Sequence, residues 1–415
     1  MRHWNKDLFA SSQFHCLTSH LVALQNTLAI STPNTFKSPR RIRFSIAGFF
    51  FISGFGFATW ASRIPSLQQQ LRLNEAQLGA VLFAMPLGLI LTLPLTGMLI
   101  GRFSSRIMVL VGAVFLNIML VLLGQVNQTW QLAFVLFCFG AARNQLSISV
   151  NAQSIGVQAL YKRSILTSFH GIWSIAGFAG AALGSFMISI HVLPSGHFML
   201  VSIFLTLVAL ALFPNTIPEP AGKSNSRTGF VLPDRALLKF GLMSFASMAF
   251  EGIMYDWSGI YFQKIVRAPT EIIALGFVAY MSAMTIGRFS GDWLVNRFNK
   301  KTVLTFSGLL MASGLLLAAV FPNVVVAGLG FIMVGFGTSC VVPLVLSLAT
   351  QSKRAETGPV IAAVSTIAYL GFLIVPPVVG FLAEALNLRW SFGLLSLLGL
   401  LMVWIVSRLP DHYRS

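Results

Sequence analysis

Five charged residues interrupt long apolar stretches of this chain, and polar chemistry would have to centre on them. They are Arg143, Glu251, Asp256, Arg288 and Asp292. An ionised side chain at the middle of a membrane-spanning helix costs about 2.5–3.5 kcal/mol on insertion scales, so each of these residues needs a compensating role. A guanidinium can hold an anionic or hydroxyl group of a small molecule, and a carboxylate can also exchange a proton with water.

Arg143 begins a polar stripe. Ser147, Asn151 and Ser154 follow it at helical spacing, and at about 100° per residue the four side chains fall within about 80° of one another. Such a stripe predicts a cavity wall whose cation binds a carboxylate, hydroxyl or phosphate group. The alternative is a structural arginine satisfied by helix-end carbonyls or by a neighbouring acid.

Glu251 and Asp256 are the acids best placed for proton exchange. Five residues separate them, so on an ideal helix they point about 140° apart and do not share a proton unless Gly252 and Gly259 break the helix. Desolvation of a carboxylate favours its protonated form, which suits reversible protonation. Glu251 is therefore the first candidate for proton coupling or solute contact. The alternative for Glu251 is a permanent ion pair, for example with Arg143.

Aromatic residues surround the second acid. Tyr255, Trp257 and Tyr261 lie within five positions of Asp256, so this group is expected to line an outer vestibule or to form an outer gate.

Three further residues could respond to charge or pH. Arg288 and Asp292 are four residues apart on one helical face, the spacing of a local ion pair, and we interpret them as a structural or gating pair. His170 shares a face with Ser174, and histidine titrates near neutral pH, which suits a pH switch. A histidine that is simply hydrogen-bonded is the alternative.

The composition indicates that the helices carrying these residues are surrounded by lipid rather than by water. The 415 residues are 56% apolar and 9% charged, whereas soluble domains carry about 25% charged residues. A soluble chain of this composition would expose apolar patches far larger than monomers tolerate. The net charge of +17 is scattered in short clusters between apolar runs, which argues against a nucleic-acid partner. The three cysteines show neither disulfide nor metal-site spacing, and no metal or cofactor is expected.

A transmembrane helix needs roughly 20 mostly apolar residues. By that measure the sequence predicts an all-α integral membrane protein with twelve transmembrane helices, arranged as two pseudo-symmetric six-helix bundles. The predicted spans are 44–62, 75–100, 106–126, 129–152, 164–190, 194–213, 237–262, 271–295, 301–321, 323–349, 357–384 and 388–408.

Lysine and arginine set the expected orientation. About 21 of the 28 basic residues lie on one side of the predicted spans, which places that side and both termini in the cytoplasm. An even number of spans is then required, in agreement with twelve. The basic segments are 1–43, 102–106, 162–163, 223–239, 297–301, 353–354 and the C-terminal tail.

A polar connection and an internal repeat divide the chain into two halves. The segment 214–236 is rich in Pro, Gly and Ser, which is typical of a flexible linker. The run Gly97-Met-Leu-Ile-Gly101-Arg102-Phe103-Ser-Ser-Arg106 has a counterpart in Asp292-Trp-Leu-Val-Asn296-Arg297-Phe298-Asn-Lys-Lys301, and two parallel repeats are a known transporter plan. The predicted parts are a cytoplasmic extension 1–42, bundles 43–213 and 237–409, the linker, and a tail 410–415.

These two loops resemble the G-x-L-x-D-R-x-G-R-R loop of the major facilitator superfamily, and the resemblance covers roughly residues 43–409. Within that family the chain is similar to the YbjJ-type permeases, a branch that includes a rhizopine-transport protein and lies near fucose permease. The patches that carry this similarity are Trp60-Ala-Ser-Arg63-Ile-Pro65, His170-Gly171-Ile-Trp173-Ser174, Glu251-Gly252 with Asp256-Trp257, Gly287-Arg288-Phe289, and Pro376-Pro377-Val-Val-Gly380 with Glu384.

The resemblance implies roles for further charges. The acid of the family loop is Gly101 in the first half and Asn296 in the second, so Asp292 is expected to stand in for it. We interpret six residues as gating or structural charges: Arg63, Arg102, Arg106, Arg288, Asp292 and Arg297.

The end of the first span is also affected by the resemblance. Trp60 and Arg63 there are candidates for substrate or gate contact. The alternatives are that Trp60 is only an anchor at the membrane interface and that Arg63 is only an exposed residue flanking the span.

Together these features predict a secondary active transporter of a small polar solute such as a sugar, a polyol or an amino sugar. It would work by alternating access, coupled to protons, as a monomer in a bacterial inner membrane. The candidate substrate and proton contacts are Arg143, Glu251, Asp256, Asn151, His170, Trp60, Tyr255 and Trp257.

Alternatives are an efflux permease for small amphipathic compounds and a transporter-like membrane sensor. An enzyme is not expected, because the sequence has no H-E-x-x-H motif, no paired intramembrane aspartates and no Ser-His-Asp grouping.

Overall fold

The computed structural model describes residues 38–162, 165–218, 235–351 and 357–409. By its internal contacts the chain divides into Met1–Arg41 and Ile42–Ser415, and the site belongs to the second unit. Most of the predicted extension 1–42 and the tail 410–415 lie outside the described residues. The same holds for most of the predicted linker and for the basic pair near 353.

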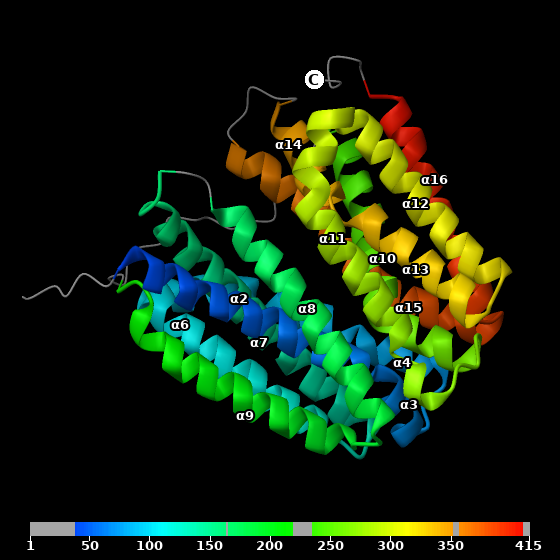
Figure 1. Cartoon of the computed structure of the whole chain (residues 1–415), viewed down its shortest axis with the longest axis horizontal. Coiled ribbons are helices and arrows are strands. Elements are labelled where there is room, and N and C mark those ends of the chain that lie inside the picture. Colours follow the sequence, from blue (N-terminus) through cyan, green and yellow to red (C-terminus); the bar gives the residue numbers. More distant parts are fainter. Residues whose placement is uncertain (1–37, 163–164, 219–234, 352–356, 410–415) are drawn as a thin grey trace, which may run out of the picture. The chain divides into compact units, whose positions relative to one another are not determined.

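The described residues form helices and no strands, which confirms the predicted fold class. The helices that precede the linker make up the first half of the protein (Figure 1). They are α2 (Pro39–Ser62), α3 (Ile64–Leu71), α4 (Glu75–Leu82), α5 (Ala84–Leu91), α6 (Leu93–Leu123), α7 (Thr129–Gln158), α8 (Leu166–Ser189) and α9 (Pro194–Leu212), followed by a 3₁₀ turn η1 (Phe213–Asn215).

The helices after the linker make up the second half. They are α10 (Arg235–Lys264), the 3₁₀ turn η2 (Thr270–Ile272), α11 (Leu275–Phe298), α12 (Lys300–Val320), α13 (Val324–Thr338), α14 (Val341–Gln351), α15 (Thr357–Ala385) and α16 (Leu388–Ser407). The predicted domain boundaries remain predictions.

Eleven helices of the described part are long and apolar enough to cross a membrane, and Glu75–Leu91 adds a shorter apolar stretch. The predicted second span is built from α4, α5 and the start of α6, while the rest of α6 forms the third span beyond a kink at Ser104. The predicted tenth span is divided between α13 and α14. The twelve predicted passes are therefore all present as helix.

The internal repeat has the same backbone conformation in both copies. Ser104 in the first loop has φ 71° and ψ 154°, and Asn299, its counterpart in the second loop, has φ 64° and ψ 161°. That region of backbone space is essentially reserved for glycine and costs another residue about 1–3 kcal/mol. The resembling family loop has its second glycine at this position, so this chain keeps the turn without the residue that suits it best.

We expect Ser104→Gly to stabilise the protein by about 1 kcal/mol, because glycine removes the strain at Ser104 at a smaller entropic cost in the unfolded chain. The measurement is the Tm of purified protein in detergent. Gly328→Ala is the matched control, since a Cβ there meets nothing within 4 Å. If the Tm of Ser104→Gly is at or below that of the parent, the backbone conformation of Ser104 does not destabilise the protein.

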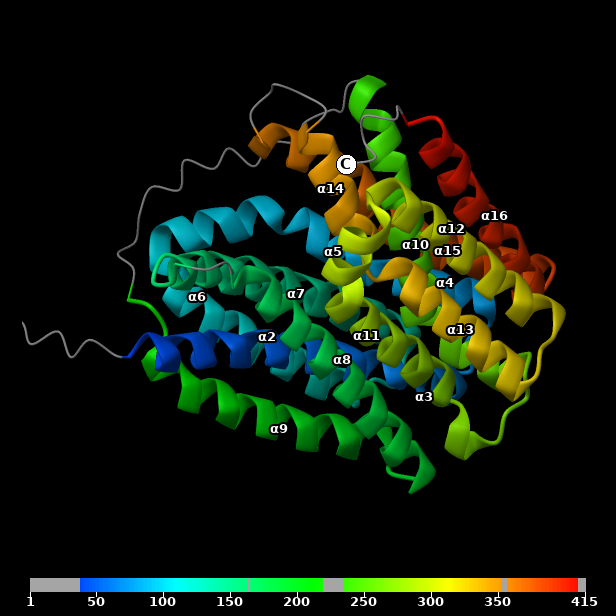
Figure 2. The same cartoon turned by 45° about the horizontal axis from the view of Figure 1, so that its top comes forward.

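Two seams join the halves. Helix α8 packs against α11, and α4 packs against α15, and both pairs lie side by side in Figures 1 and 2. At the second seam, a Cβ added to Gly79 would lie 2.6 Å from the Pro376 carbonyl oxygen, so the two backbones touch. These seams bring residues far apart in sequence around a common centre.

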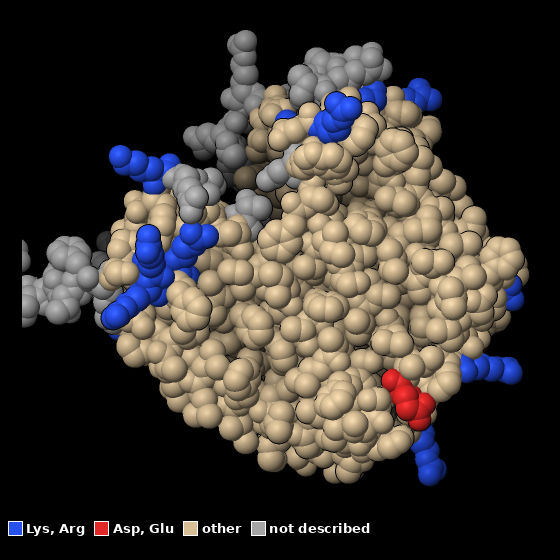
Figure 3. Space-filling model, in the orientation of Figure 1, with Lys and Arg blue, Asp and Glu red and all other residues tan. Residues whose placement is uncertain are grey.

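The two ends of the helices differ in charge. We call the end that carries the Ser104 and Asn299 turns the basic side, because exposed Arg102 and Arg297 lie there. The opposite end, where α4 begins and α10 ends, we call the sparse side. Glu75 and Lys264 form an ion pair of 2.6 Å between the halves on that side. Figure 3 shows Lys and Arg along the upper and left edges of this face, and acidic side chains at the lower right beside further basic ones.

Candidate functional site

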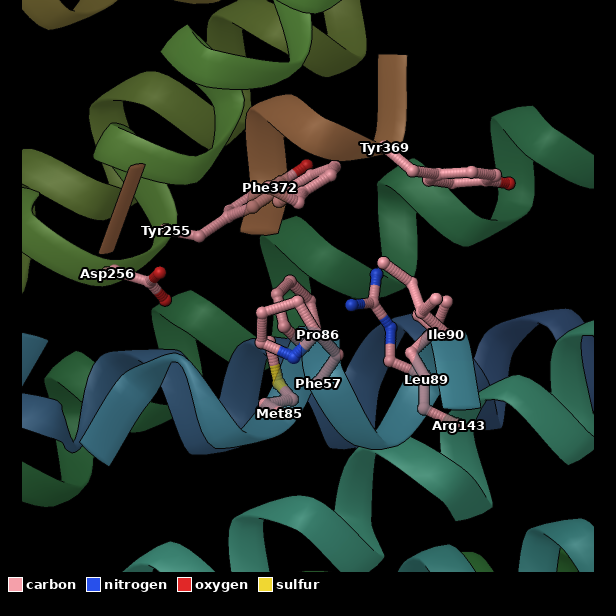
Figure 4. A pocket seen from close by; sticks show the side chains of 10 residues that line it. All are labelled: Phe57, Met85, Pro86, Leu89, Ile90, Arg143, Tyr255, Asp256, Tyr369 and Phe372. Atoms are coloured by element: carbon pink, nitrogen blue, oxygen red, sulfur yellow. The ribbon is translucent and has the colours of Figure 1, made fainter. Parts of the chain in front are cut away.

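A cavity of about 70 Å³ lies between the two halves (Figure 4). The first half contributes residues of α2, α5 and α7, and the second half contributes residues of α10 and α15. Its walls are mostly apolar, with a few polar groups, which is the usual composition of a small-molecule site. The lining residues are Phe57, Met85, Pro86, Leu89, Ile90, Arg143, Tyr255, Asp256, Tyr369 and Phe372.

Arg143 provides the positive charge of this cavity. Its guanidinium carbon lies 3.9 Å from the centroid of the Phe57 ring, a cation–π contact. In the described part of the protein its N–H groups have no hydrogen-bond or ion-pair partner, and Figure 4 shows the guanidinium directed into the cavity. A structural arginine held by helix-end carbonyls or by a paired acid would have such partners. The predicted role of Arg143 as a binding cation therefore stays a prediction, with neither kind of structural partner found for it among the described residues.

Asp256 provides the negative charge. Its side chain is 5% exposed, and within the described residues it accepts no hydrogen bond. Figure 4 places its carboxylate at the edge of the cavity on the α10 side, whereas Arg143 comes from α7 in the other half. Arg143 is the cation with which this carboxylate interacts electrostatically. The cavity therefore has one charge of each sign on opposite walls, and neither is neutralised by direct contact.

Glu251 lies next to the cavity without lining it. The hydroxyl of Tyr255 donates a hydrogen bond of 3.3 Å to Glu251 Oε2, and the ring of Tyr255 forms part of the cavity wall. Arg143 forms no ion pair with Glu251 within the described structure, so the predicted permanent pair between them is not formed. Tyr255 is thus the physical link between the cavity and this buried acid.

Arg288 contacts the other half of the protein. Its Nη1 donates a hydrogen bond of 2.8 Å to the hydroxyl of Ser174 on α8, and its guanidinium lies 5.5 Å from the Trp173 ring. The side chain of Asp292 lies outside the described residues, so the predicted Arg288–Asp292 pair stays a prediction. The observed partner is 114 positions away in sequence.

Other predicted site residues lie away from the cavity wall. Asn151 donates to the Ser147 carbonyl of its own helix at 2.8 Å. Trp60 and Trp257 are fully buried in the protein, and Trp60 packs against Phe139. His170 is exposed and packs edge-on against Phe50. These four remain predictions without a place among the lining residues.

The predicted gating arginines differ in environment. Arg63 is buried, and its guanidinium donates to His197 Nδ1 at 3.1 Å and to the Val192 carbonyl at 2.8 Å. The alternative of an exposed flank was wrong for Arg63, because its side chain is 2% exposed and is held by partners at and just before the start of α9. Burial lowers its pKa to about 10, so Arg63 stays charged at neutral pH.

The arginines of the basic side have aromatic or solvent-facing surroundings. Arg102 lies 5.4 Å from the ring of its neighbour Phe103, and Arg106 lies 5.1 Å from the ring of Phe213. Arg297 is exposed at the end of α11. Their gating role remains a prediction.

The apolar half of the cavity wall was not singled out from sequence. Phe57, Leu89 and Ile90 in the first half and Tyr369 and Phe372 in the second have no polar pattern around them that marks a site. Pro86, inside an apolar run, was a weak signal. Among the described residues, no three His, Cys, Asp or Glu side chains come together in a way that could hold a metal ion.

Comparison with known proteins gives a consistent result. The sequence model of the Major Facilitator Superfamily matches residues 46–356 and 242–415. An uncharacterized MFS-type transporter of Yersinia pestis is 31% identical over 349 residues, which span 84% of this chain and 91% of that protein. The membrane protein MosC of Rhizobium meliloti is 28% identical over 375 residues, 89% of this chain and 90% of the relative.

Solved structures share the fold. A mutant form of the nucleoside transporter NupG superimposes with a TM-score of 0.72 at 13% identity, over 88% of this chain and 99% of that one. The transporter FucP in its outward conformation gives 0.60 at 18% identity, over 89% of this chain and 98% of that one. Identities this low show a common fold and nothing about the site.

Proposed function

Because the chain belongs to the Major Facilitator Superfamily, we propose that it carries a small polar solute by alternating access and couples that movement to protons. The relatives and the family are transporters, so the chain is a multi-pass membrane transporter and not an enzyme. The solute class, the coupling ion and the direction are the proposal.

The proposal depends on one observation: Arg143 and Asp256 face the same cavity, and neither has a hydrogen-bond or ion-pair partner among the described residues. A charge without a partner in a low-dielectric site raises the free energy of the folded protein. A bound solute that pairs with both charges would offset that free energy. A solute that accepts hydrogen bonds from Arg143 and donates hydrogen bonds to Asp256 would do so. Sugars, polyols and amino sugars carry both kinds of group.

The rings around the cavity support a solute with a flat apolar face. Tyr255 and Phe372 are nearly parallel, with ring centroids 6.1 Å apart, and both line the cavity. Aromatic faces stack on the C–H face of a sugar ring while polar groups hold its hydroxyls. FucP, a fucose:proton symporter, and the nucleoside transporter NupG share this fold; fucose is a sugar, and a nucleoside contains one.

Because the two binding charges come from opposite halves, the solute would be held between the bodies that move. Rocking of the halves would then expose the cavity first to one side of the membrane and then to the other. The chain has no G-x-x-x-x-G-K-[ST] phosphate-binding loop, so the energy for accumulation must come from an ion gradient. Asp256 and Glu251 are the acids that could carry protons across.

Charge on the two sides supports an orientation with the basic side in the cytoplasm of a bacterial inner membrane, with both termini there. We propose that the carrier works as a monomer, since the cavity is complete within one chain.

An efflux permease for small amphipathic compounds is the second candidate. Met85, Leu89 and Ile90 make one wall of the cavity apolar, and such a wall suits a solute with a larger apolar face.

Reconstitution into proteoliposomes tests the proposal. A thermal-shift screen of purified protein against sugars, polyols, amino sugars and amphipathic cations would first identify a ligand. Uptake of that ligand would then be measured with an inward or an outward proton gradient. Accumulation with the inward gradient, abolished by a protonophore, is the expected result. Accumulation only with the reversed gradient would favour efflux, and gradient-independent equilibration would remove proton coupling.

A further inference from the structure

An aromatic ring occupies the place beside Arg143 that a counter-ion would take. The guanidinium carbon of Arg143 lies 3.9 Å from the centroid of the Phe57 ring, whereas that of Arg106 lies 5.1 Å from the Phe213 ring. Within the described residues the Arg143 side chain forms no ion pair. The electron-rich face of Phe57 is therefore the close contact that stabilises this positive charge.

A ring and an acid leave different parts of an arginine free. A carboxylate can accept two parallel N–H groups and so occupies one edge of the guanidinium. A ring face attracts the cation through its quadrupole and accepts no conventional hydrogen bond. Arginine has five N–H groups, and Figure 4 shows the guanidinium of Arg143 directed into the cavity. The contact with Phe57 thus holds the charge while N–H groups stay available to a solute.

The Phe57 ring is itself held from both halves of the protein. It is 2% exposed, lies 6.4 Å from the Trp173 ring of α8 at an angle of 24°, and meets the Tyr255 ring of α10 edge to face at 5.0 Å. The backbone nearby is also constrained, because a Cβ added to Gly54 would lie 2.4 Å from the Trp173 carbonyl oxygen. Neighbours on α8 and α10 restrict the ring, so the ring can restrict Arg143.

We propose that Phe57 is a positioning residue for solute binding: its ring face replaces a counter-ion for Arg143 and holds the guanidinium where a solute can accept its N–H groups. This inference rests on the proposed binding role of Arg143. An aliphatic side chain at position 57 would fill similar space without attracting the cation. A carboxylate there would attract the cation and also occupy its N–H groups. Only an aromatic ring provides the attraction and leaves the donors free.

Fluorinated phenylalanines at position 57 separate the electrostatic effect of the ring from its volume. Fluorine withdraws electron density from the ring face and is little larger than hydrogen. Mono-, di- and trifluorinated phenylalanine are introduced by nonsense suppression, and each purified protein is treated with butanedione, which modifies the neutral form of arginine. Modification of Arg143 is followed by mass spectrometry of its peptide, and exposed Arg297 serves as the internal reference.

The modification rate of Arg143 should rise stepwise with the number of fluorine atoms. Each fluorine weakens the attraction that keeps the guanidinium charged and on the ring. Between the parent and the trifluorinated protein we expect an increase of about tenfold, the size of effect of a cation–π contact in a desolvated site. Phe57→Leu should react about as fast as the trifluorinated protein. Phe57→Tyr, which restores an electron-rich ring, should react about as slowly as the parent.

Phe139 provides the matched control. It is fully buried on α7, one turn before Arg143, and its described ring contact is with Trp60 at 6.5 Å rather than with a cation. The same fluorinated series at Phe139 should leave the Arg143 rate unchanged. A constant Arg143 rate across the Phe57 series, or an equal rise in the Phe139 series, would overturn the proposal and leave Phe57 as a packing residue.

Transport measurements connect the contact to solute binding. In proteoliposomes the KM for uptake should rise across the Phe57 series in the same order as the Arg143 rate, while the maximal rate changes little, because the ring acts on binding. An unchanged KM beside a graded Arg143 rate would show that the ring holds Arg143 without positioning it for a solute. If no solute is transported but the Arg143 rate is still graded, the contact stands and the proposed function fails. If uptake is proton-driven and the Arg143 rate is constant, only the role of Phe57 fails.

Discussion

Replacing Arg143 with methionine is expected to abolish solute binding at the central cavity without harming the fold. Two hydrogen bonds from a charged donor are worth about 3 kcal/mol or more in total, so the Kd should rise at least about a hundredfold. Methionine keeps an apolar side chain of similar length on the Phe57 ring and removes an unpaired charge from the protein interior. The Tm without ligand should therefore stay the same or rise, while the ligand-induced shift disappears.

Arg389 supplies the contrast for this experiment. Its guanidinium donates to the carbonyls of Ala319 and Val320 at the end of α12, so it is an arginine with structural partners. Arg389→Met should lower the Tm and leave the ligand Kd unchanged. If Arg143→Met instead lowers the Tm like Arg389→Met and keeps the Kd, then Arg143 is structural and the binding site is not this cavity.

The cost of burying charge explains why sequence alone pointed to this region of the molecule. A chain with so few ionisable groups in its spans can hold them only where water or a partner reaches them, and Arg143, Asp256 and Tyr255 do line one cavity. Turn residues and apolar length likewise predicted the helices, since a spanning segment must satisfy its own backbone. The positions of the buried charges and of the helices can both be predicted because the membrane interior is nonpolar, without knowledge of how the side chains pack.

The nonpolar surroundings also explain why the remaining residues of the site could not be predicted from the sequence. In a soluble helix the apolar face marks the core, but here lipid-facing, core and cavity-lining positions are all apolar. Nothing in the sequence around Phe57, Leu89 or Phe372 distinguishes them from lipid-facing neighbours such as Leu91, which is 60% exposed. Only the three-dimensional arrangement shows which aromatic and aliphatic residues meet at the centre.

The spacing of residues along the chain predicts contacts only within one helix. The four-residue interval between Arg288 and Asp292 favoured a local pair, which stays a prediction, and the structure shows a further partner of Arg288 on α8. A hydroxyl on another helix leaves no trace in the spacing along the chain. The strained turns at Ser104 and Asn299 are the opposite case, because the glycine of the resembling loop falls at both positions and could have predicted their unusual backbone.

A leucine at Gly79 is expected to stop transport by keeping the sparse side open. At the α4–α15 seam a Cβ on Gly79 would lie 2.6 Å from the Pro376 carbonyl oxygen and 3.0 Å from the Gly380 Cα, and backbone atoms cannot move aside as a flexible side chain can. The halves would have to separate at this point to admit the side chain. Overpacking of this kind costs about 1–3 kcal/mol or more, enough to shift a balanced equilibrium between the two states by about tenfold to a hundredfold.

The expected result is a fall of at least about tenfold in solute uptake, with ligand binding still measurable from the open side. Pro65 is buried against Gly259 of the other half, so a cysteine introduced at Pro65 should also react readily with a membrane-impermeant maleimide in this variant. Gly328→Leu is the control, since its Cβ meets nothing within 4 Å, and it should transport like the parent. Lys264→Ala should have a small effect, because the two side chains of its ion pair with Glu75 are 37% and 21% exposed and solvent weakens the interaction. Backbone contact, not the ion pair, would then be what closes this side. Parent-like uptake by Gly79→Leu would show that the seam does not have to close for the solute to cross.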